Sequence, residues 1–439
     1  MLILGSIPIF MARELSKTAY TLRSVATGKA FEDTGWSLDP LGEVTPSLIR
    51  AEYQQKQLDV KDEEYGIYKF ADWLPVSRML KGSSAPVTYK SEGLAQELGL
   101  SNLYVTFNGW WPERGAYNRT CSFKETEAYS VCGRMGTDFG KTLVVASAGN
   151  TARAFAKVCS DNEIPLLLCV PEDNLNALWF DKPIASCVKL ICTKKGSDYF
   201  DAINLSNLAC QVDGYIAEGG AKNIARRDGM GTTMLSAATF IGQIPDYYFQ
   251  AVGSGTGAIA AWEANLRLIA DGRFGARKAK LMVAQNAPFT PMYDAWKADS
   301  RALLPMDDDD ARRSVEEIVA KVLSNRKPPY SISGGLFDAL KDAGGDILVA
   351  TNEAAAAAAA MFEKLEGIDI HPAAAVALAS LINAVKDGMV EPDAVIMLNI
   401  TGGGEERYKG DFPLHYLKPS AIFDYNPTLE EVRERIANL

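Results

Sequence analysis

Residues 141–156, KTLVVASAGNTARAFA, have the pattern of a buried strand, a short turn and a helix. Apolar residues fill 143–146, the turn ends in Gly149 and Asn150, and a helix-compatible run follows. Apolar runs at 164–170, 187–192 and 214–217 repeat the alternation of strand and helix. Continuous apolar strands separated by helical segments predict a parallel sheet that is covered on both faces.

A second series of apolar runs follows at 247–252, 280–284, 346–350 and 394–398. We therefore predict an α/β fold with two parallel-sheet units. The site is expected between them, because open α/β sheets bind ligands at the carboxyl ends of their strands. The predicted larger unit combines residues 1–140 with 221–439, and the smaller, inserted unit spans 141–220. Residues 1–80 are expected to form an irregular and helical N-terminal arm.

Composition limits the function classes. The 439 residues carry a net charge of −10, which argues against non-specific binding to nucleic acid or anionic membranes. No apolar run is long enough to span a membrane, and the opening segment 1–10 lacks the basic start of a signal peptide. Met11 is an alternative start to Met1. We predict a cytoplasmic protein.

The cysteines and histidines argue against a metal centre. Seven cysteines lie between residues 121 and 210 without a C-x-x-C pair, which favours reduced thiols over a disulfide framework or a zinc site. Only His371 and His415 are present, too few for a His-rich metal centre. The acidic run 307–310 fits the start of a helix better than a calcium site. No metal is predicted.

Lys124 is the candidate reactive residue. It ends the segment NRTCSFK, residues 118–124, and the helix-compatible run 125–129 follows it. In an apolar cleft its amine would lose proton affinity and act as a nucleophile and proton carrier. The alternative is an ordinary exposed lysine.

The turn SAGNT, residues 147–151, lies between a predicted strand and a helix start, where unpaired N–H groups bind anions. Its Asn150 is predicted to hydrogen-bond a ring oxygen of a cofactor. The other four residues are predicted to hold a substrate carboxylate: Ser147, Ala148, Gly149 and Thr151. A plain strand-to-helix turn is the alternative.

A glycine loop follows a later strand and is predicted to cradle a phosphate through its backbone; it consists of Gly253, Ser254, Gly255, Thr256 and Gly257. The same residues, with Ala258, satisfy a dinucleotide-binding fingerprint. That fingerprint requires an acidic residue about 20 positions later, at the end of the next strand. Asp271 has the spacing but precedes that strand, so a dehydrogenase is disfavoured and phosphate binding remains.

A lysine, a carboxylate-binding turn and a phosphate loop, in this order, are what a pyridoxal phosphate pocket requires. Thr401, in LNITGGG at 398–404, ends a strand at a further glycine turn. Its hydroxyl is predicted to meet the pyridine nitrogen. A neutral partner there would favour elimination and replacement over transamination. The alternative is a threonine that only ends a strand.

These motifs resemble the fold type II family of pyridoxal phosphate enzymes, the tryptophan synthase β-like family, and within it threonine synthase. The resemblance covers roughly residues 85–405. It assigns the Schiff-base lysine to Lys124, the ring contacts to Asn150 and Thr401, and phosphate binding to the glycine loop. In this chain Arg119 replaces a proline of the family motif, and Glu125-Thr126 replaces Asp-Arg. Asn223 and Arg226 match a threonine synthase segment that helps to hold the substrate phosphate.

With the segment YYFQAVGSGTG at 247–257, the chain is most similar to the cysteate synthase branch of that family. The resemblance implies β-replacement of the phosphate of O-phospho-L-serine by sulfite, on a route to coenzyme M. We also expect a homo-oligomer. Arg119 is then a candidate contact for sulfite. Two alternatives stay open: threonine synthesis from O-phosphohomoserine and water, and a non-catalytic amino-acid sensor, against which the intact Lys124 argues.

Overall fold

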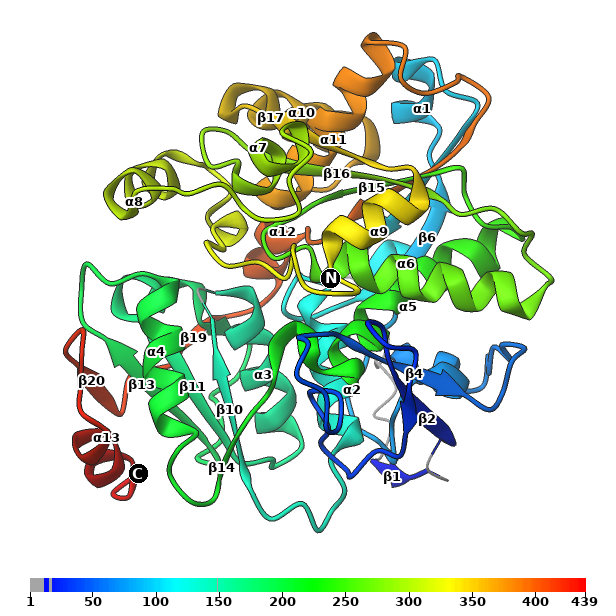
Figure 1. Ribbon diagram of the computed structural model, residues 1–439. Helices are drawn as coiled ribbons and strands as arrows, with labels where there is room; N and C mark the ends of the chain where they lie inside the picture. The colour runs from blue at the N-terminus through cyan, green and yellow to red at the C-terminus, as the bar shows by residue number, and fades with distance from the viewer. Residues whose placement is uncertain (1–11, 16–17, 148) are drawn as a thin grey trace.

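The computed structural model describes residues 12–15, 18–147 and 149–439. Both alternative starts, Met1 and Met11, and Ala148 of the predicted turn lie outside these residues. The chain forms two parallel-sheet units, one in the upper half of Figure 1 and one at its lower left. The predicted α/β class with two sheets is therefore confirmed.

The larger sheet has the strand order β17-β16-β15-β18-β7-β6, and β6 alone runs antiparallel to its neighbour. Its strands are β6 (Val87–Lys90), β7 (Asn102–Phe107), β15 (Tyr247–Ala251), β16 (Lys280–Asn286), β17 (Asp346–Ala350) and β18 (Val395–Ile400). The last four match predicted strands. The sequence did not reveal β6 and β7, because polar residues interrupt their apolar pattern.

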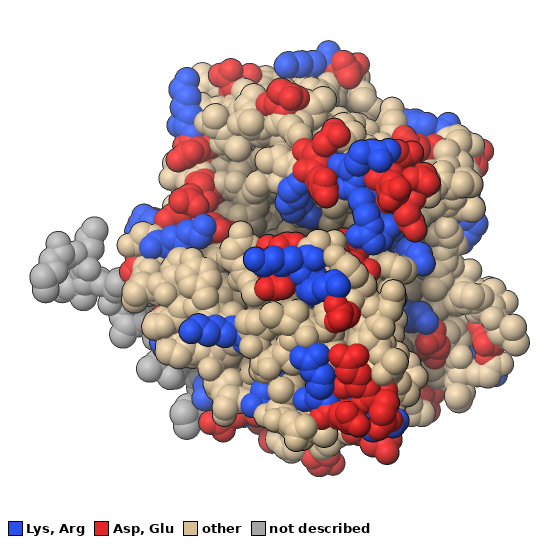
Figure 2. All heavy atoms as spheres, turned by 90° about the vertical axis from the view of Figure 1, so that its left-hand side faces the viewer, with Lys and Arg blue, Asp and Glu red and all other residues tan. Residues whose placement is uncertain are grey.

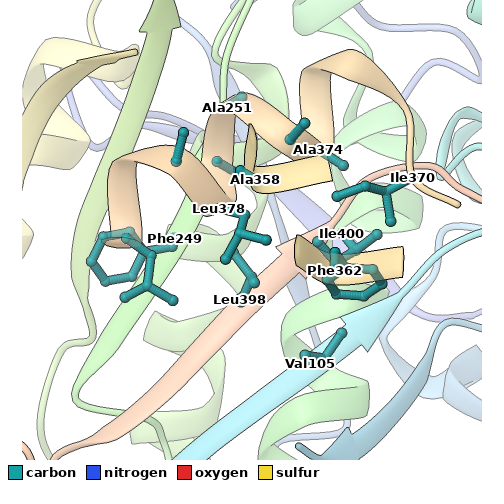
Figure 3. Packing of buried hydrophobic residues seen from close by; sticks show 14 of the residues in the cluster. Val105, Phe249, Ala251, Ala358, Phe362, Ile370, Ala374, Leu378, Leu398 and Ile400 are labelled. Atoms are coloured by element: carbon teal, nitrogen blue, oxygen red, sulfur yellow. The ribbon is translucent and has the colours of Figure 1, made fainter. Parts of the chain in front are cut away.

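Helices cover both faces of this sheet. Neighbouring residues of a strand point to opposite faces, so each strand contributes side chains to two separate cores. On one face, Ala358 of α10 (Asn352–Glu366) and Ala374 and Leu378 of α11 (Pro372–Lys386) share a core with Phe249 and Leu398 (Figure 3). On the other face, Tyr248 and Met397 share a core with α5 (Ile224–Ile241), α6 (Thr256–Asp271) and α9 (Leu336–Ala343). The carboxyl ends of the strands stay free for ligand binding.

The smaller sheet is parallel throughout and has the order β14-β10-β11-β13-β20. Its strands are β10 (Thr142–Ala146), β11 (Leu166–Pro171), β13 (Val188–Thr193), β14 (Tyr215–Ala217) and β20 (Ala421–Phe423). The first four were predicted. β20 returns from the C-terminal segment, and α13 (Leu429–Ile436) then packs on α4 (Tyr199–Ala209). Helix α2 (Lys124–Arg134) shares a core with this sheet.

The predicted boundaries between the two units, at residues 140/141 and 220/221, stay a prediction. The inserted segment 141–220 contains four of the five strands of the smaller sheet, but β20 and α2 come from ranges that were assigned to the larger unit. The C-terminal segment crosses from one unit to the other, as the red end of the chain in Figure 1 shows.

The N-terminal arm is mostly irregular, as expected, but it also contains a small antiparallel sheet that the sequence did not reveal. β2 (Tyr20–Ser24) pairs with β3 (Ala30–Phe31) and with β4 (Ile49–Tyr53). In β2 and β4 alternate residues are buried, and Leu22, Ile49 and Tyr53 join the core under α5 and α6. The short 3-10 helix η1 (Gly66–Trp73) is the helical part of residues 18–80.

Short elements complete the described chain: β1 (Arg13–Glu14), β5 (Arg78–Met79), α1 (Gly93–Leu98), β8 (Trp110–Trp111), η2 (Pro112–Arg114), β9 (Ala116–Tyr117), α3 (Asn150–Asp161), η3 (Glu172–Ala177), β12 (Trp179–Phe180), η4 (Gly220–Lys222), α7 (Pro291–Lys297), α8 (Asp308–Glu317), η5 (Lys321–Leu323), α12 (Glu405–Asp411) and β19 (His415–Tyr416). Asp307 caps α8 by accepting hydrogen bonds from two of its amides, so the acidic run starts a helix.

Within the described ranges, no helix is both long and apolar enough to cross a membrane. Acidic and basic side chains are interspersed on the face in Figure 2, which carries no extended basic surface. Such a surface is what non-specific nucleic-acid binding requires.

Candidate active site

A cavity of about 640 Å³ lies where loops of the two units meet. It is lined from the smaller unit by the turn at 147–151 and from the larger one by the glycine loop and the segment 322–332. The predicted residues that line it are Ser147, Gly149, Asn150, Thr151, Lys124, Arg226, Gly253, Ser254, Gly255, Thr256, Gly257 and Thr401. The structure thus brings five separate segments of the chain to one site.

Lys124 is the first residue of α2, and hydrogen bonds fix the turn before it. The Thr120 N–H and Oγ1 both donate to the Glu125 carboxylate, at 2.8 and 2.9 Å. The Phe123 N–H donates to the carbonyl of Thr401 at 2.9 Å. Burial raises the pKa of Glu125 to about 7, and the bonds from Thr120 oppose that shift. Lys124 is thereby tied to the end of β18.

The Lys124 amine is the electrostatic centre of the cavity. Its side chain is 19% exposed, and its Nζ lies 3.2 Å from Oε2 of Glu127. Burial lowers the pKa of Lys124, and Glu127 acts in the opposite direction. A lowered pKa increases the fraction of neutral amine, which is the form that attacks a carbonyl or removes a proton.

The glycine loop fits a phosphate group. A Cβ at Gly253 would lie 2.8 Å from the carbonyl oxygen of Val322, and one at Gly257 would lie 2.6 Å from the side-chain nitrogen Nε2 of Gln250. Gly255 has a φ of +79°, and α6 begins at the next residue. The loop therefore presents backbone and the N-terminus of a 16-residue helix to the cavity, an arrangement that binds phosphate.

Two amides of the turn that was predicted to hold a carboxylate already have partners within the protein. The Ser147 N–H donates to the Cys169 carbonyl and the Gly149 N–H to Ser147 Oγ. Among the described residues of the turn, the amides that remain for a carboxylate are those at Asn150 and Thr151 in the first turn of α3, since helix-starting N–H groups have no intrahelical partner.

Arg153 orients the Asn150 side chain, a role that the sequence analysis missed. Its Nη2 donates to Asn150 Oδ1 at 2.9 Å, so the Asn150 amide hydrogens remain for a ligand oxygen. The buried guanidinium also donates to the carbonyls of Thr120 and Ala177 and lies over Trp179. The helical i, i+3 spacing of Asn150 and Arg153 was the available sequence signal.

His371 is a second residue that the sequence analysis left without a role. It lines the cavity next to Thr401, and its Nε2 lies 2.7 Å from Oε2 of Glu405. Although burial opposes ionisation of Glu405, His371, Arg153 and Lys409 hold the pKa of its carboxyl well below its usual range. A carboxylate that basic side chains already balance therefore lies behind His371 in the cavity wall.

Arg119 and Asn223 are not brought to the cavity, so the structure does not support their predicted contacts with substrate. Arg119 pairs with Asp181, with 2.9 Å between Nη1 and Oδ2, and lies over Phe412. Asn223 is the buried N-cap of α5 and accepts a hydrogen bond from Arg134. An ion pair and a helix cap occupy these side chains.

Arg226 lines the cavity, but carboxylates already balance its charge. Its Nε donates to Glu218 at 2.8 Å, and its Nη1 lies 3.4 Å from Oε1 of Glu127. Burial opposes the charge, but Glu127 and Glu218 outweigh it and raise the pKa of Arg226. A substrate anion would have to share this guanidinium with them.

Thr401 follows β18, is 7% exposed and lines the cavity. If its hydroxyl meets the pyridine nitrogen, Thr401→Ala should slow turnover by roughly 2- to 10-fold, the loss of one neutral hydrogen bond. Thr401→Asp should protonate the nitrogen, change the absorbance of the bound cofactor and increase transamination. Absorbance spectra and side-product analysis check both variants. Unchanged spectra and rates in both would leave Thr401 only a structural role.

Comparisons with known proteins show which chains this one resembles. The family model described as pyridoxal-phosphate dependent enzyme matches residues 90–402. A cysteate synthase of Methanosarcina mazei is 52% identical over 389 residues, 88% of this chain and 93% of its own. A cysteate synthase of Methanospirillum hungatei is 44% identical over 419 residues, 95% and 98% of the two chains.

Solved structures with the same fold are more distant in sequence. Maize serine racemase superposes with a TM-score of 0.55 at 15% identity, over 74% of this chain and 92% of its own. Threonine deaminase isoform 2 from Solanum lycopersicum has a TM-score of 0.53 at 16% identity, over 74% and 86%. At these identities the likeness concerns the fold alone.

Proposed function

The chain belongs to the pyridoxal-phosphate-dependent enzyme family, and from this premise we propose that it makes L-cysteate and phosphate from O-phospho-L-serine and sulfite, on a route to coenzyme M. Cysteate synthases that are 44–52% identical over most of both chains support this choice. The observation that carries the proposal is the single cavity that holds Lys124, Asn150, Thr401 and the glycine loop.

Bound pyridoxal phosphate supplies an aldehyde for amine nitrogens and a ring that accepts electrons from the α-carbon. Lys124 would hold it covalently, with the glycine loop on its phosphate and Asn150 and Thr401 on its ring. The Lys124 amine can remove the proton from the substrate α-carbon and return it after sulfite has replaced phosphate at Cβ.

The remaining groups position the substrate. Amides at the start of α3 can hold its carboxylate, which fixes the α-carbon relative to Lys124. Arg226 is the candidate for the leaving phosphate, because it lines the cavity and keeps its charge. Phosphoserine and sulfite are both anions, so a cation in the cavity would stabilise them when both are bound.

Phosphate release and product analysis test the substrates. The protein should convert phosphoserine to cysteate only when sulfite is present. It should turn over phosphohomoserine at least about tenfold more slowly, because one extra methylene moves the phosphate out of register. Mass spectrometry identifies the amino acids, and phosphate release gives the rates. Faster formation of threonine from phosphohomoserine than of cysteate from phosphoserine would refute the substrate assignment but not the cofactor assignment.

We also propose a cytoplasmic location and a homo-oligomeric state. All seven cysteines are free thiols, which supports a reducing compartment. Light scattering of the purified protein would give the mass of the assembly.

A further inference from the structure

A buried carboxylate lies against the reactive lysine. Lys124 and Glu127 are three residues apart on α2, so their side chains share a face of the helix. The Glu127 side chain is 0% exposed, and its Oε2 is 3.2 Å from Lys124 Nζ. Carboxylates are almost never fully buried unless a cation pairs with them, so this position requires a compensating charge.

A second cation faces the same carboxylate from another helix. Arg226 of α5 places Nη1 3.4 Å from Oε1 of Glu127, an oxygen without a hydrogen-bond partner among the described residues. Arg226 is itself bonded to Glu218, which follows β14. Glu127 therefore lies between two cations, and only one of them, Lys124, reacts.

The charge of Lys124 changes during the reaction, whereas that of Arg226 does not. Lys124 carries a full ammonium charge only while its nitrogen is free of the cofactor and protonated, whereas Arg226 stays charged throughout. Without Arg226, each loss of the Lys124 charge would leave the Glu127 carboxylate without a compensating charge in the protein interior, which is strongly unfavourable. With Arg226 in place, Glu127 keeps a cationic partner while Lys124 changes state.

We propose that Glu127 is the residue that holds the Lys124 ammonium whenever the amine is free, and that Arg226 remains the cationic partner of Glu127 when it is not. The proposal deepens the proposed function, since it rests on Lys124 as the residue that binds the cofactor and carries the proton. Glu127 then stabilises Lys124 after it has taken the α-proton. Glu127 also holds the free Lys124 side chain in the same position between steps of the reaction.

The groups around Nζ give the sign of the effect. Glu127 and Glu218 favour the charged amine, whereas burial and Arg226 favour the neutral amine. Tyr199 of α4 faces Arg226 and both carboxylates, and His371 lines the cavity beyond them. Removing the Glu127 charge should therefore lower the pKa of Lys124.

Competitive acetylation of the full-length, cofactor-free chain measures this pKa without substrate. Acetic anhydride is applied across a pH series, and the Lys124 peptide is quantified by mass spectrometry. In Glu127→Gln the pKa of Lys124 should fall by roughly 1 to 3 units, the usual effect of an opposite charge at this distance. Glu127→Asp keeps the charge at a longer distance and should give a smaller fall.

Asp33→Asn is the matched control. Asp33 forms a comparably buried pair with Arg134, with 2.8 Å between Oδ2 and Nη2, at the far end of α2. The Asp33→Asn variant should leave the pKa of Lys124 unchanged. An unchanged or raised pKa in Glu127→Gln overturns the proposal, as does an equal fall in Asp33→Asn. If Glu127→Gln does not fold, an unchanged pKa in Glu127→Asp overturns it.

The holoenzyme gives a second measurement. The pH at which the absorbance of bound cofactor changes should move in Glu127→Gln and stay in Asp33→Asn, and an unmoved transition in Glu127→Gln contradicts the proposal. Neither experiment uses phosphoserine or sulfite. A wrong substrate would therefore appear in the turnover assay and a wrong role for Glu127 in the titrations.

Discussion

Lys124→Ala should lower the rate of cysteate formation by about 10³-fold or more, because it removes both the covalent attachment and the proton carrier. Lys124→Arg should be as inactive. It keeps a cation beside Glu127, but a guanidinium neither attacks a carbonyl nor gives up its proton at neutral pH. Phosphate release from phosphoserine with sulfite measures both variants. Lys141→Ala, at an exposed lysine before β10, should retain wild-type activity.

Covalent attachment can be checked independently of turnover. Borohydride reduction of the wild-type holoenzyme, followed by peptide mapping, should place the pyridoxyl group on Lys124. Lys124→Ala should carry no such label after the same treatment. A label on another lysine, or substantial activity in Lys124→Ala, would contradict the assignment. An unlabelled wild type would favour the amino-acid sensor alternative.

The strands that the sequence revealed are those buried on both faces. Residues 143–146 and 166–170 are continuous apolar runs because helices or other segments cover each side of the strand. β7 carries Asn102 and Thr106, and β20 is a three-residue strand at the sheet edge. Their patterns are too short or too mixed to distinguish them from loops. The pairing of β20 with β13 joins residues about 230 positions apart, which no local pattern encodes.

The site shows the same distinction between local and distant information. Lys124, Asn150 and the glycine loop start helices or follow strands, so the local chain determines where they point. The environment of Arg119 depends on Asp181 and Phe412, which come from other parts of the chain.

Arg226 shows the limit most clearly, because its position in the cavity was predicted but its charge balance was not. The carboxylates of Glu127 and Glu218 become its partners only after α2, β14 and α5 have packed. Sequence motifs therefore locate the reactive groups of this cavity, whereas tertiary packing sets their charge.

Gly253→Ala should weaken binding of pyridoxal phosphate by roughly 5- to 150-fold. The added Cβ would lie 2.8 Å from the Val322 carbonyl and 3.0 Å from Leu323 Cα, and backbone cannot rotate away as a side chain can. Such overpacking costs about 1–3 kcal/mol. The cofactor-free loop can relax from the contact, but the bound loop has to keep its shape around the phosphate. The strain should therefore appear as lost affinity.

Fluorescence titration of the cofactor-free chain with pyridoxal phosphate measures the affinity. Gly410→Ala is the control, because no atom lies within 4 Å of its added Cβ and the residue belongs to α12, away from the cavity lining. It should bind the cofactor as the wild type does. Thermal unfolding with and without cofactor distinguishes a loss of fold stability from a loss of cofactor binding. A Gly253→Ala variant that is equally destabilised in both states, with unchanged affinity, would show that the glycine serves the fold and not the phosphate. A larger loss of stability in the cofactor-bound state would place the strain in the phosphate cradle, as the contact with the Val322 carbonyl predicts.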